Sequence, residues 1–290
     1  AIRVRVGECT GDDCPCVPGQ ACSQKSNAFY MPSDSEFGTP AIRVAEGDGI
    51  NLKDLHFDAG VVGHELGHHV VVATVTDYAG RGEPLSLHEG LSDFFVMMQQ
   101  DSPCMGRGIC PGGGRTCYTN ACLRTADNDL TYGSSEYLAA AAHQKGQLIS
   151  GMLWDLKEGG IATSDLVRLV LGAIDLLPSA ASFGDFGVAM LVADANLFDG
   201  TFRNQIEQAS LARGLDRSSR TLSIADPLVI AENVAPTTNV WGCTAAVGPA
   251  SGRGIDLFML VLLGLPAVVR GSRRATRRPS RLCTDKFHKV

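Results

Sequence analysis

The sequence has 290 residues, of which 44% are hydrophobic and 19% charged, with a formal net charge of −6 at pH 7. These proportions are ordinary for a folded globular protein, and the length suffices for one large domain or for two lobes around a shared cleft. The basic residues crowd the end of the chain after position 269, so the rest is more acidic than the total charge suggests. We therefore expect no nucleic-acid partner.

Ten cysteines are more than a typical cytosolic enzyme contains. Eight of them form two clusters in stretches rich in Gly, Pro and Thr, namely Cys9, Cys14, Cys16 and Cys22, and then Cys104, Cys110, Cys117 and Cys122. We expect disulfides formed in an oxidising compartment, and therefore a secreted or cell-surface protein. A structural zinc site is the alternative, but neither cluster contains paired C-x2-C motifs. The chain begins at Ala1 without an initiator Met, so we expect a fragment or processed form of a longer precursor.

The first half of the chain combines short strands with two helices. Periodicity predicts two strands and two helices, at 27–31, 41–44, 58–76 and 85–99. Asp58 is the expected N-cap of the first helix, because its carboxylate can accept from a free backbone N–H. Before and between these elements lie a Cys-rich segment with little periodicity and a long Cys- and Gly-rich loop, at 1–25 and 101–133. A loop of that length inside a domain is usually functional or stapled by disulfides.

The second half is helical. Four helices are expected, at about 135–157, 164–177, 183–198 and 202–213. The sequence thus predicts a strand-containing N-terminal lobe at 26–134, with a Cys-rich insertion at 101–124, and a helical C-terminal lobe at 135–235. Such an arrangement indicates an α+β fold with a cleft between the lobes.

The last segment, 236–290, is expected to be a linker followed by a short apolar stretch and a basic tail. The apolar stretch at 257–269 has thirteen residues, whereas a membrane-spanning helix needs about twenty. The arginines that follow it are typical of a positive-inside anchor, so we expect membrane association or sorting through 257–269. A buried core helix is the alternative, but Pro266 and the basic tail disfavour it.

His64, Glu65 and His68 form an H-E-x-x-H motif within the helix expected at 58–76. Residues four apart lie on one face of a helix, so both imidazoles can reach the same ion. Zinc takes histidine nitrogens at about 2.0–2.1 Å in a tetrahedral shell with one open position. Glu65 can reach that position and act there as general base for the metal's water. Two ordinary histidines are the alternative, but the apolar surroundings make their burial without a partner costly.

Zinc needs a third protein ligand, and the second predicted helix offers three candidates. A histidine six residues after His68 would indicate a metzincin, but Thr74 stands there, which excludes that class. Glu89 and Asp93 are four apart and share a face, whereas His88 points about 100° away. We expect Glu89 to bind the metal and Asp93 to accept the free N–H of a ligand histidine. His88 or Asp93 as the third ligand remain alternatives.

The two motifs together resemble the gluzincin metallopeptidases, specifically the thermolysin and fungalysin families. In these families H-E-x-x-H is followed about twenty residues on by E-x-x-x-D, which here begins at Glu89 and ends at Asp93. The resemblance covers roughly residues 25–215. It implies a zincin-like fold, Zn²⁺ bound by His64, His68 and Glu89, and Asp93 behind a ligand histidine.

Further stretches extend the resemblance to substrate binding and catalysis. The stretch from Asn27 and Ala28 to Tyr30 is similar to the family's edge strand, which implies that Asn27 and Ala28 hold the substrate peptide. The stretches around Arg124 and His143 are similar to those that carry the family's donors to the developing oxyanion. The resemblance therefore implies catalytic roles for Arg124 and His143.

The sequence departs from the family at several points. The family usually has an acidic residue just before the equivalent of His143, whereas Glu136 here lies seven residues before it, so what orients His143 is open. The acidic clusters that bind calcium in thermolysin are not evident, and Asp127 and Asp129 are the one close pair near the site. We therefore expect no calcium. Tyr78, ten residues after His68, is a further candidate donor.

The sequence thus predicts a zinc endopeptidase that hydrolyses peptide bonds of proteins and uses Glu65 as general base. An inactive zinc-binding surface or adhesion module on the same fold is the main alternative. A disulfide-rich extracellular binding domain without metal is a second alternative. Nothing in the sequence indicates an oligomeric state.

Overall fold

A computed structural model describes residues 2–6, 27–34, 38–49, 52–75, 78–110 and 122–222. The described residues all belong to one compact unit, Ala1–Ala246. The segments expected at 236–290 and 257–269 lie outside the described residues, and the division into lobes at 26–134 and 135–235 stays a prediction. Within the described ranges, no helix is long and apolar enough to cross a membrane.

Three short strands form a sheet in the order β1-β3-β2, with bounds Arg3–Val6 (β1), Ala28–Met31 (β2) and Ala41–Val44 (β3). The central strand β3 pairs parallel with β1 and antiparallel with β2. The two expected strands are confirmed, and β1 is a further strand, in the segment at 1–25 where the sequence shows little periodicity. Within the described ranges, β2 lies at the end of the strand order and pairs with β3 alone, so its other edge has backbone groups with which another chain could pair.

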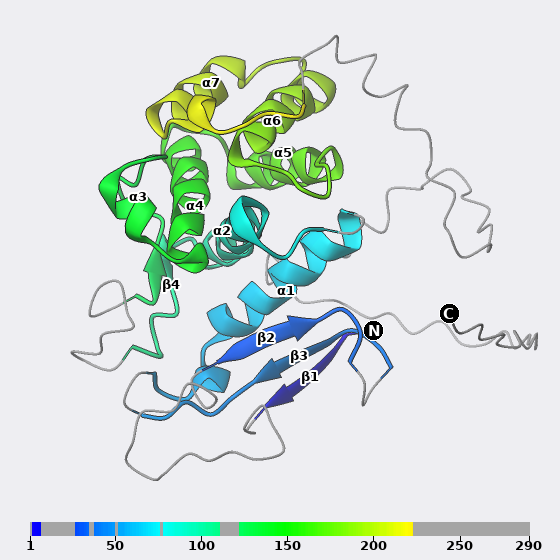
Figure 1. Ribbon diagram of the computed structural model, residues 1–290, viewed down its shortest axis with the longest axis vertical. Helices are drawn as coiled ribbons and strands as arrows, with labels where there is room; N and C mark the ends of the chain where they lie inside the picture. Colours follow the sequence, from blue (N-terminus) through cyan, green and yellow to red (C-terminus); the bar gives the residue numbers. More distant parts are fainter. Residues whose placement is uncertain are drawn as a thin grey trace, which may run out of the picture. The chain divides into compact units, whose positions relative to one another are not determined.

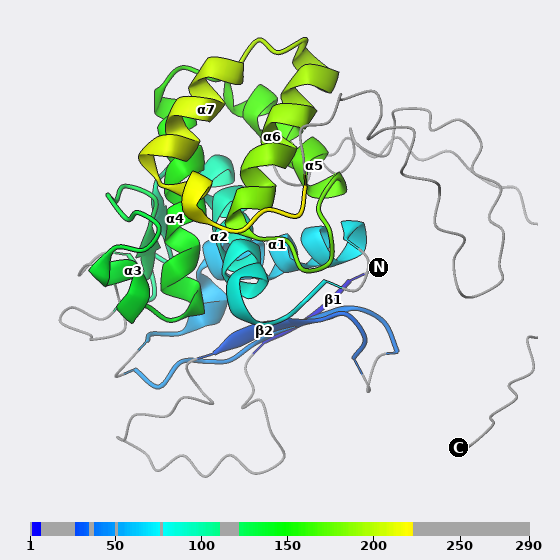
Figure 2. The ribbon, with the colours of Figure 1, turned by 45° about the horizontal axis from the view of Figure 1, so that its top comes forward.

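Helix α1, Ala59–Thr74, lies between this sheet and the other helices (Figures 1 and 2). Asp58 caps it as expected, because the Asp58 Oδ1 atom accepts from the Gly60 N–H at 2.7 Å. Helix α2, Gly82–Gln100, packs against α1 and begins three residues earlier than the sequence predicts. The two helices approach closely at Gly67, where an added Cβ would lie 2.7 Å from the Ser92 Cα atom.

Helix α4, Ala142–Glu158, packs on the other side of α2, and the two cross at a pair of glycines. A Cβ atom on Gly90 would lie 2.3 Å from the Gly146 carbonyl oxygen, and one on Gly146 would lie 2.7 Å from the Gly90 nitrogen. The two backbones are therefore in direct contact. Gly90 follows Glu89, and Gly146 lies three residues after His143, so this crossing brings Glu89 and His143 together.

The helix expected at 135–157 is interrupted, so that prediction was wrong in its extent. Helix α3 is Ser135–Ala139, and the next residue, Ala140, has extended backbone with a ψ of 148° before α4 begins. Tyr137 of α3 packs against the rings of Tyr132 and Phe183, whereas α4 packs on α2. Four consecutive alanines surround the break, and alanine favours helix, so local helix propensity does not explain it.

The remaining helices match the expected ones to within two residues: α5 is Thr163–Asp175, α6 is Phe183–Phe198 and α7 is Arg203–Ala212. Short 3₁₀ helices lie at Leu55–Phe57 and Leu215–Arg217. Helix α6 begins with a capping box, in which Ser182 and Asp185 bond each other's backbone N–H groups. The described chain is thus mostly helical with small sheets, which confirms the α+β expectation.

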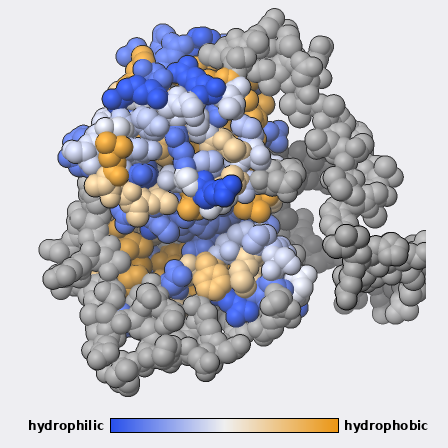
Figure 3. Space-filling view, viewed as in Figure 1, coloured by the Kyte–Doolittle hydropathy of each residue, from blue (hydrophilic) through white to orange (hydrophobic). Residues whose placement is uncertain are grey.

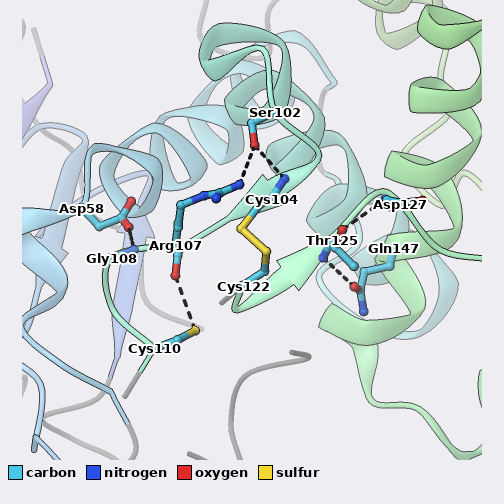
Figure 4. The surroundings of a disulfide bond; sticks show 11 residues. Asp58, Ser102, Cys104, Arg107, Gly108, Cys110, Cys122, Thr125, Asp127 and Gln147 are labelled. Atoms are coloured by element: carbon cyan, nitrogen blue, oxygen red, sulfur yellow. Dashed lines mark hydrogen bonds between the residues drawn. A yellow bond between two sulfur atoms is a disulfide. The ribbon is translucent and has the colours of Figure 1, made fainter. Parts of the chain in front are cut away.

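Residues 101–133 are not all loop, as Figure 4 shows. Strand β4, Cys104–Met105, pairs antiparallel with β5, Arg124–Thr125, and a disulfide joins Cys104 to Cys122. This disulfide confirms the expected chemistry for two cysteines of the second cluster, whereas Cys117 and the whole first cluster lie outside the described residues. The Gly108 N–H donates to Asp58 Oδ2 at 2.9 Å, which ties this hairpin to the start of α1.

We expect Gly90→Ala to destabilise the protein by about 1–3 kcal/mol, because the added methyl group overpacks the contact with Gly146. Gly80→Ala is the matched control, since a Cβ there meets nothing within 4 Å. Urea denaturation followed by circular dichroism measures both changes. Equal stability of the two variants would contradict the direct helix crossing.

Candidate metal centre

The two histidines of α1 and the glutamate of α2 converge. One ligand atom from each of His64, His68 and Glu89 lies within 4.8 Å of the others. The Glu89 Oε2 atom is 3.1 Å from His64 Nε2 and 3.7 Å from His68 Nε2. Two ligand atoms of a tetrahedral zinc ion lie roughly 3.3–3.5 Å apart, so these three groups fit zinc in both spacing and chemistry.

The second nitrogen of each histidine has a partner of its own. His64 Nδ1 lies 2.7 Å from Asp93 Oδ1, which is the contact that the sequence predicts for Asp93. His68 Nδ1 lies 3.0 Å from the Ser92 hydroxyl oxygen. Each Nδ1–H can thus donate to an α2 side chain, which leaves each Nε2 lone pair for a metal. Sequence reasoning missed Ser92, although it lies within the E-x-x-x-D motif, three residues after Glu89.

The rival third ligands are occupied elsewhere. His88 Nε2 lies 3.2 Å from the His68 carbonyl oxygen, which makes it the donor in that contact. The Asp93 carboxylate faces Nδ1 of His64 and not the nitrogen that faces Glu89. The geometry therefore favours Glu89 over both alternatives.

Arg124, on β5, completes the buried layer behind His64. Its Nε and Nη2 atoms donate to Asp93 Oδ2 and Oδ1 at 2.6 and 2.8 Å, and Nη2 also lies 3.3 Å from His64 Nδ1. Burial alone would raise the pKa of Asp93, but Arg124 and His64 together lower it to about 2. Asp93 is therefore a carboxylate that holds a ligand histidine on one side and a guanidinium on the other.

Burial and charges within the cluster shift the pKa values of the metal-free ligands in opposite directions. Burial disfavours a charged His64, but Asp93 and Glu89 raise its pKa to about 9. Burial also opposes ionisation of Glu89, yet the three neighbouring histidines lower its pKa. The pKa of His68 is lowered, first by burial and then by His64 and His88. Before any metal binds, the donor set thus contains an ionised Glu89, a neutral His68 and a protonated His64, whose Nε2 proton a metal ion would displace.

Glu65 lines the same site, and its carboxyl combines burial with one oxygen that lacks a hydrogen bond. It is buried, and its Oε2 atom has no hydrogen-bond partner within the described part of the chain. Burial raises the pKa of Glu65 to about 7, and the carboxylate of Glu89 contributes in the same direction. A buried carboxyl with one free oxygen and a pKa near neutrality is suited to accept and return a proton.

His143 stands at the open side of the cluster. Its Nε2 atom lies 3.4 Å from Glu89 Oε2, and its side chain is half exposed in the first turn of α4. Burial lowers its pKa, which Glu89 partly offsets. The hydroxyl of Tyr78, the further candidate donor, donates to the Pro84 carbonyl oxygen at 2.7 Å, and its ring meets that of His88 edge to face.

Two adjoining cavities flank the cluster, of about 240 and 390 Å³. Both are lined by Asn27, Ala28, His64, Glu65 and His143. The smaller cavity continues along Arg124 and a group of apolar side chains, namely Leu52, Leu55, Val61, Met105 and Leu123. Figure 3 shows hydrophobic side chains at this part of the surface, between β2 and β4. The larger cavity continues along β2 and past His68 and His88. The structure thus places Asn27 and Ala28 beside the cluster, at the edge strand.

No protein-family model and no curated protein matches the sequence. Among solved structures, the chain is similar to the precursor of protealysin, a metalloproteinase from Serratia proteamaculans, with a TM-score of 0.52 and 16% sequence identity. The match covers 65% of this chain and 65% of that chain, just under two thirds of its length. The chain therefore shares its fold with this metalloproteinase precursor over the matched part, and it carries a His-His-Glu group that could hold a metal ion.

Replacement of Asp93 by Leu should destabilise the metal-free protein by about 3–5 kcal/mol, because the buried Arg124 loses its counter-charge. Asp101→Asn is the control, since Asp101 is an exposed partner of Lys157, and we expect a change within about 0.5 kcal/mol. Urea denaturation near pH 7 measures both.

The same variant tests the pH dependence of stability. The folded-state pKa of Asp93, about 2, lies below its ordinary value of 3.8. The stabilisation is therefore complete above pH 4 and is lost as the pH falls through 2, so the difference between wild type and Asp93→Leu should shrink over that range. A difference that grows with acidification would contradict the assignment.

Proposed function

We propose that this protein is a zinc-dependent endopeptidase of the gluzincin type, related to the thermolysin and fungalysin families. The observation that carries the proposal is the convergence of His64 Nε2, His68 Nε2 and a Glu89 oxygen, with the unpartnered Oε2 atom of Glu65 beside them. Two imidazoles, one carboxylate and an open side form the donor set typical of catalytic zinc. The fold of the chain, shared with a metalloproteinase precursor, supports the same class.

Zinc in this cluster would supply a Lewis acid that polarises a peptide carbonyl and lowers the pKa of water. Glu65 would take the proton of the attacking water, because its carboxyl has a free oxygen and a pKa of about 7. After attack, the same carboxyl would return the proton to the nitrogen of the leaving amine. Its burial keeps bulk water from competing for this proton.

Arg124 and His143 would stabilise the negative charge that develops on the carbonyl oxygen. Both line the smaller cavity, next to Glu65, and both can donate N–H groups there. The salt bridge to Asp93 fixes the guanidinium of Arg124 before the substrate arrives, so no reorganisation accompanies charge development.

The substrate would be a protein or peptide bound in extended form. Among the described strands, β2 pairs on one side only, and its first residue Ala28, with Asn27 before it, lines both cavities. A peptide could pair with its other edge through backbone hydrogen bonds. The apolar walls of the smaller cavity would take a hydrophobic side chain next to the cleaved bond. The Cys104–Cys122 disulfide favours an extracytoplasmic location.

Metal binding can be tested directly. We expect one zinc ion per chain in the wild type and in Glu65→Gln, whereas Glu89→Ala should retain little zinc after dialysis because it lacks a ligand. Inductively coupled plasma mass spectrometry measures the stoichiometry. Retention of zinc by Glu89→Ala at the wild-type level would overturn the gluzincin assignment.

An assay of peptide hydrolysis distinguishes the proposed endopeptidase from an inactive zinc-binding module. The wild type should cleave casein, a chelator should stop the cleavage, and added zinc should restore it. Glu65→Gln should lower kcat by at least about a hundredfold while zinc stays bound, because it removes the general base. Stoichiometric zinc without hydrolysis in the wild type would instead support an inactive zinc-binding surface module.

A further inference from the structure

Gln147 connects the strand of Arg124 to the helix of His143. It lies on α4, one turn after His143, and only 2% of it is exposed. Its Oε1 atom accepts from the backbone N–H of Thr125 at 2.9 Å, a contact drawn in Figure 4. Thr125 follows Arg124 directly, so this one buried amide spans the two proposed oxyanion donors.

Asn128 reinforces the same contact. Its Nδ2 group donates to the Thr125 carbonyl oxygen at 2.8 Å and to the Gln147 carbonyl oxygen at 3.2 Å. The backbone N–H and C=O of Thr125 are thus both bonded to amide side chains, from α4 and from the turn after β5. Because β5 is only two residues long, these bonds supply much of what fixes its position.

Arg213 ties this arrangement to α4 at a second point. Its Nη1 atom donates to Asn128 Oδ1 at 3.0 Å, and its Nε atom donates to Asp155 Oδ2 at 2.8 Å. Asp155 lies on α4, two turns after Gln147. The segment after β5 is therefore anchored to α4 twice, through Gln147 and through Arg213.

His143 lacks the acidic neighbour that would orient it, so its position depends on how α4 is docked. Within the described residues its one charged contact is Glu89, at 3.4 Å. Arg124 is bonded to α2 through Asp93, and α2 meets α4 at Gly90 and Gly146. Gln147 closes this ring of contacts directly, from α4 back to β5.

Building on the proposed function, we propose that Gln147 is a positioning residue, which holds Arg124 and His143 at the separation that a single carbonyl oxygen requires. Gln147 contacts neither substrate nor metal in this role. It acts through the Thr125 N–H and through the first turn of α4. Misplacement of such a donor by about 1 Å can cost up to a hundredfold in rate.

The test is a double-mutant cycle between Gln147→Met, which keeps the length of the side chain but removes the acceptor, and Arg124→Ala. Alone, Gln147→Met should lower kcat about tenfold or more, with zinc retained and KM within about twofold. In the Arg124→Ala background the same change should alter kcat by less than about twofold, since the positioned donor is gone. Gln208→Met, at an exposed position of α7, is the matched control.

An equal loss in both backgrounds would show that Gln147 only stabilises the fold and would overturn the proposal. Should Gln147→Met not fold, Asn128→Ala takes its place in the same cycle. Hydrogen exchange of the metal-free protein gives a readout without catalysis, because loss of the acceptor should speed exchange in peptides covering 122–130. Unchanged exchange there would also overturn the positioning role of Gln147. An inactive wild type that shows the expected exchange would instead count against the proposed endopeptidase function alone.

Discussion

The Asp93 carboxylate, shared between His64 and Arg124, is the interaction on which the rest of the site depends. A buried charge is tolerated only with a counter-charge and hydrogen bonds, and Asp93 receives both from two sides. One contact fixes the tautomer and ring orientation of a proposed metal ligand, and the other fixes a proposed oxyanion donor. The proposed metal binding and the proposed catalysis would thus be coupled through one residue that has no direct role in either.

Backbone contacts determine whether these side chains can meet at all. Gly67 lets α1 approach α2 beside Ser92, which holds His68, and the Gly90–Gly146 contact lets α2 approach α4 beside Glu89 and His143. In both places a Cβ atom would separate the helices by enough to take a ligand or donor out of reach. Gly67 and Gly90, the glycines inside the two motifs, are therefore needed for close helix packing, whereas their polar neighbours are needed for chemistry.

The sequence predicted the parts of the molecule that depend on local pattern. Both helices of the metal cluster, the Asp58 cap and β3 follow from periodicity and capping, and i, i+4 spacing alone put Glu89 and Asp93 on one face. The break at Ala140 lies within a run of alanines, where the local pattern predicts a continuous helix. The pairing of β4 with β5 depends on contacts between distant segments, so no local pattern predicts it. The roles of Ser92 and Gln147 were missed for the same reason, because each is defined by a partner more than twenty residues away.

The hairpin that carries Arg124 illustrates how a very short element becomes rigid. Two paired residues on each strand cannot hold a register by themselves. Here a disulfide between positions 18 apart removes conformational freedom from the unfolded chain, an effect of about 3 kcal/mol for loops of this size. Gln147 and Asn128 then bind the remaining backbone groups of Thr125. The disulfide limits the positions that β5 can take, and the two buried amide side chains fix one of them. The proposed oxyanion donor Arg124 would therefore be held in place before a substrate binds.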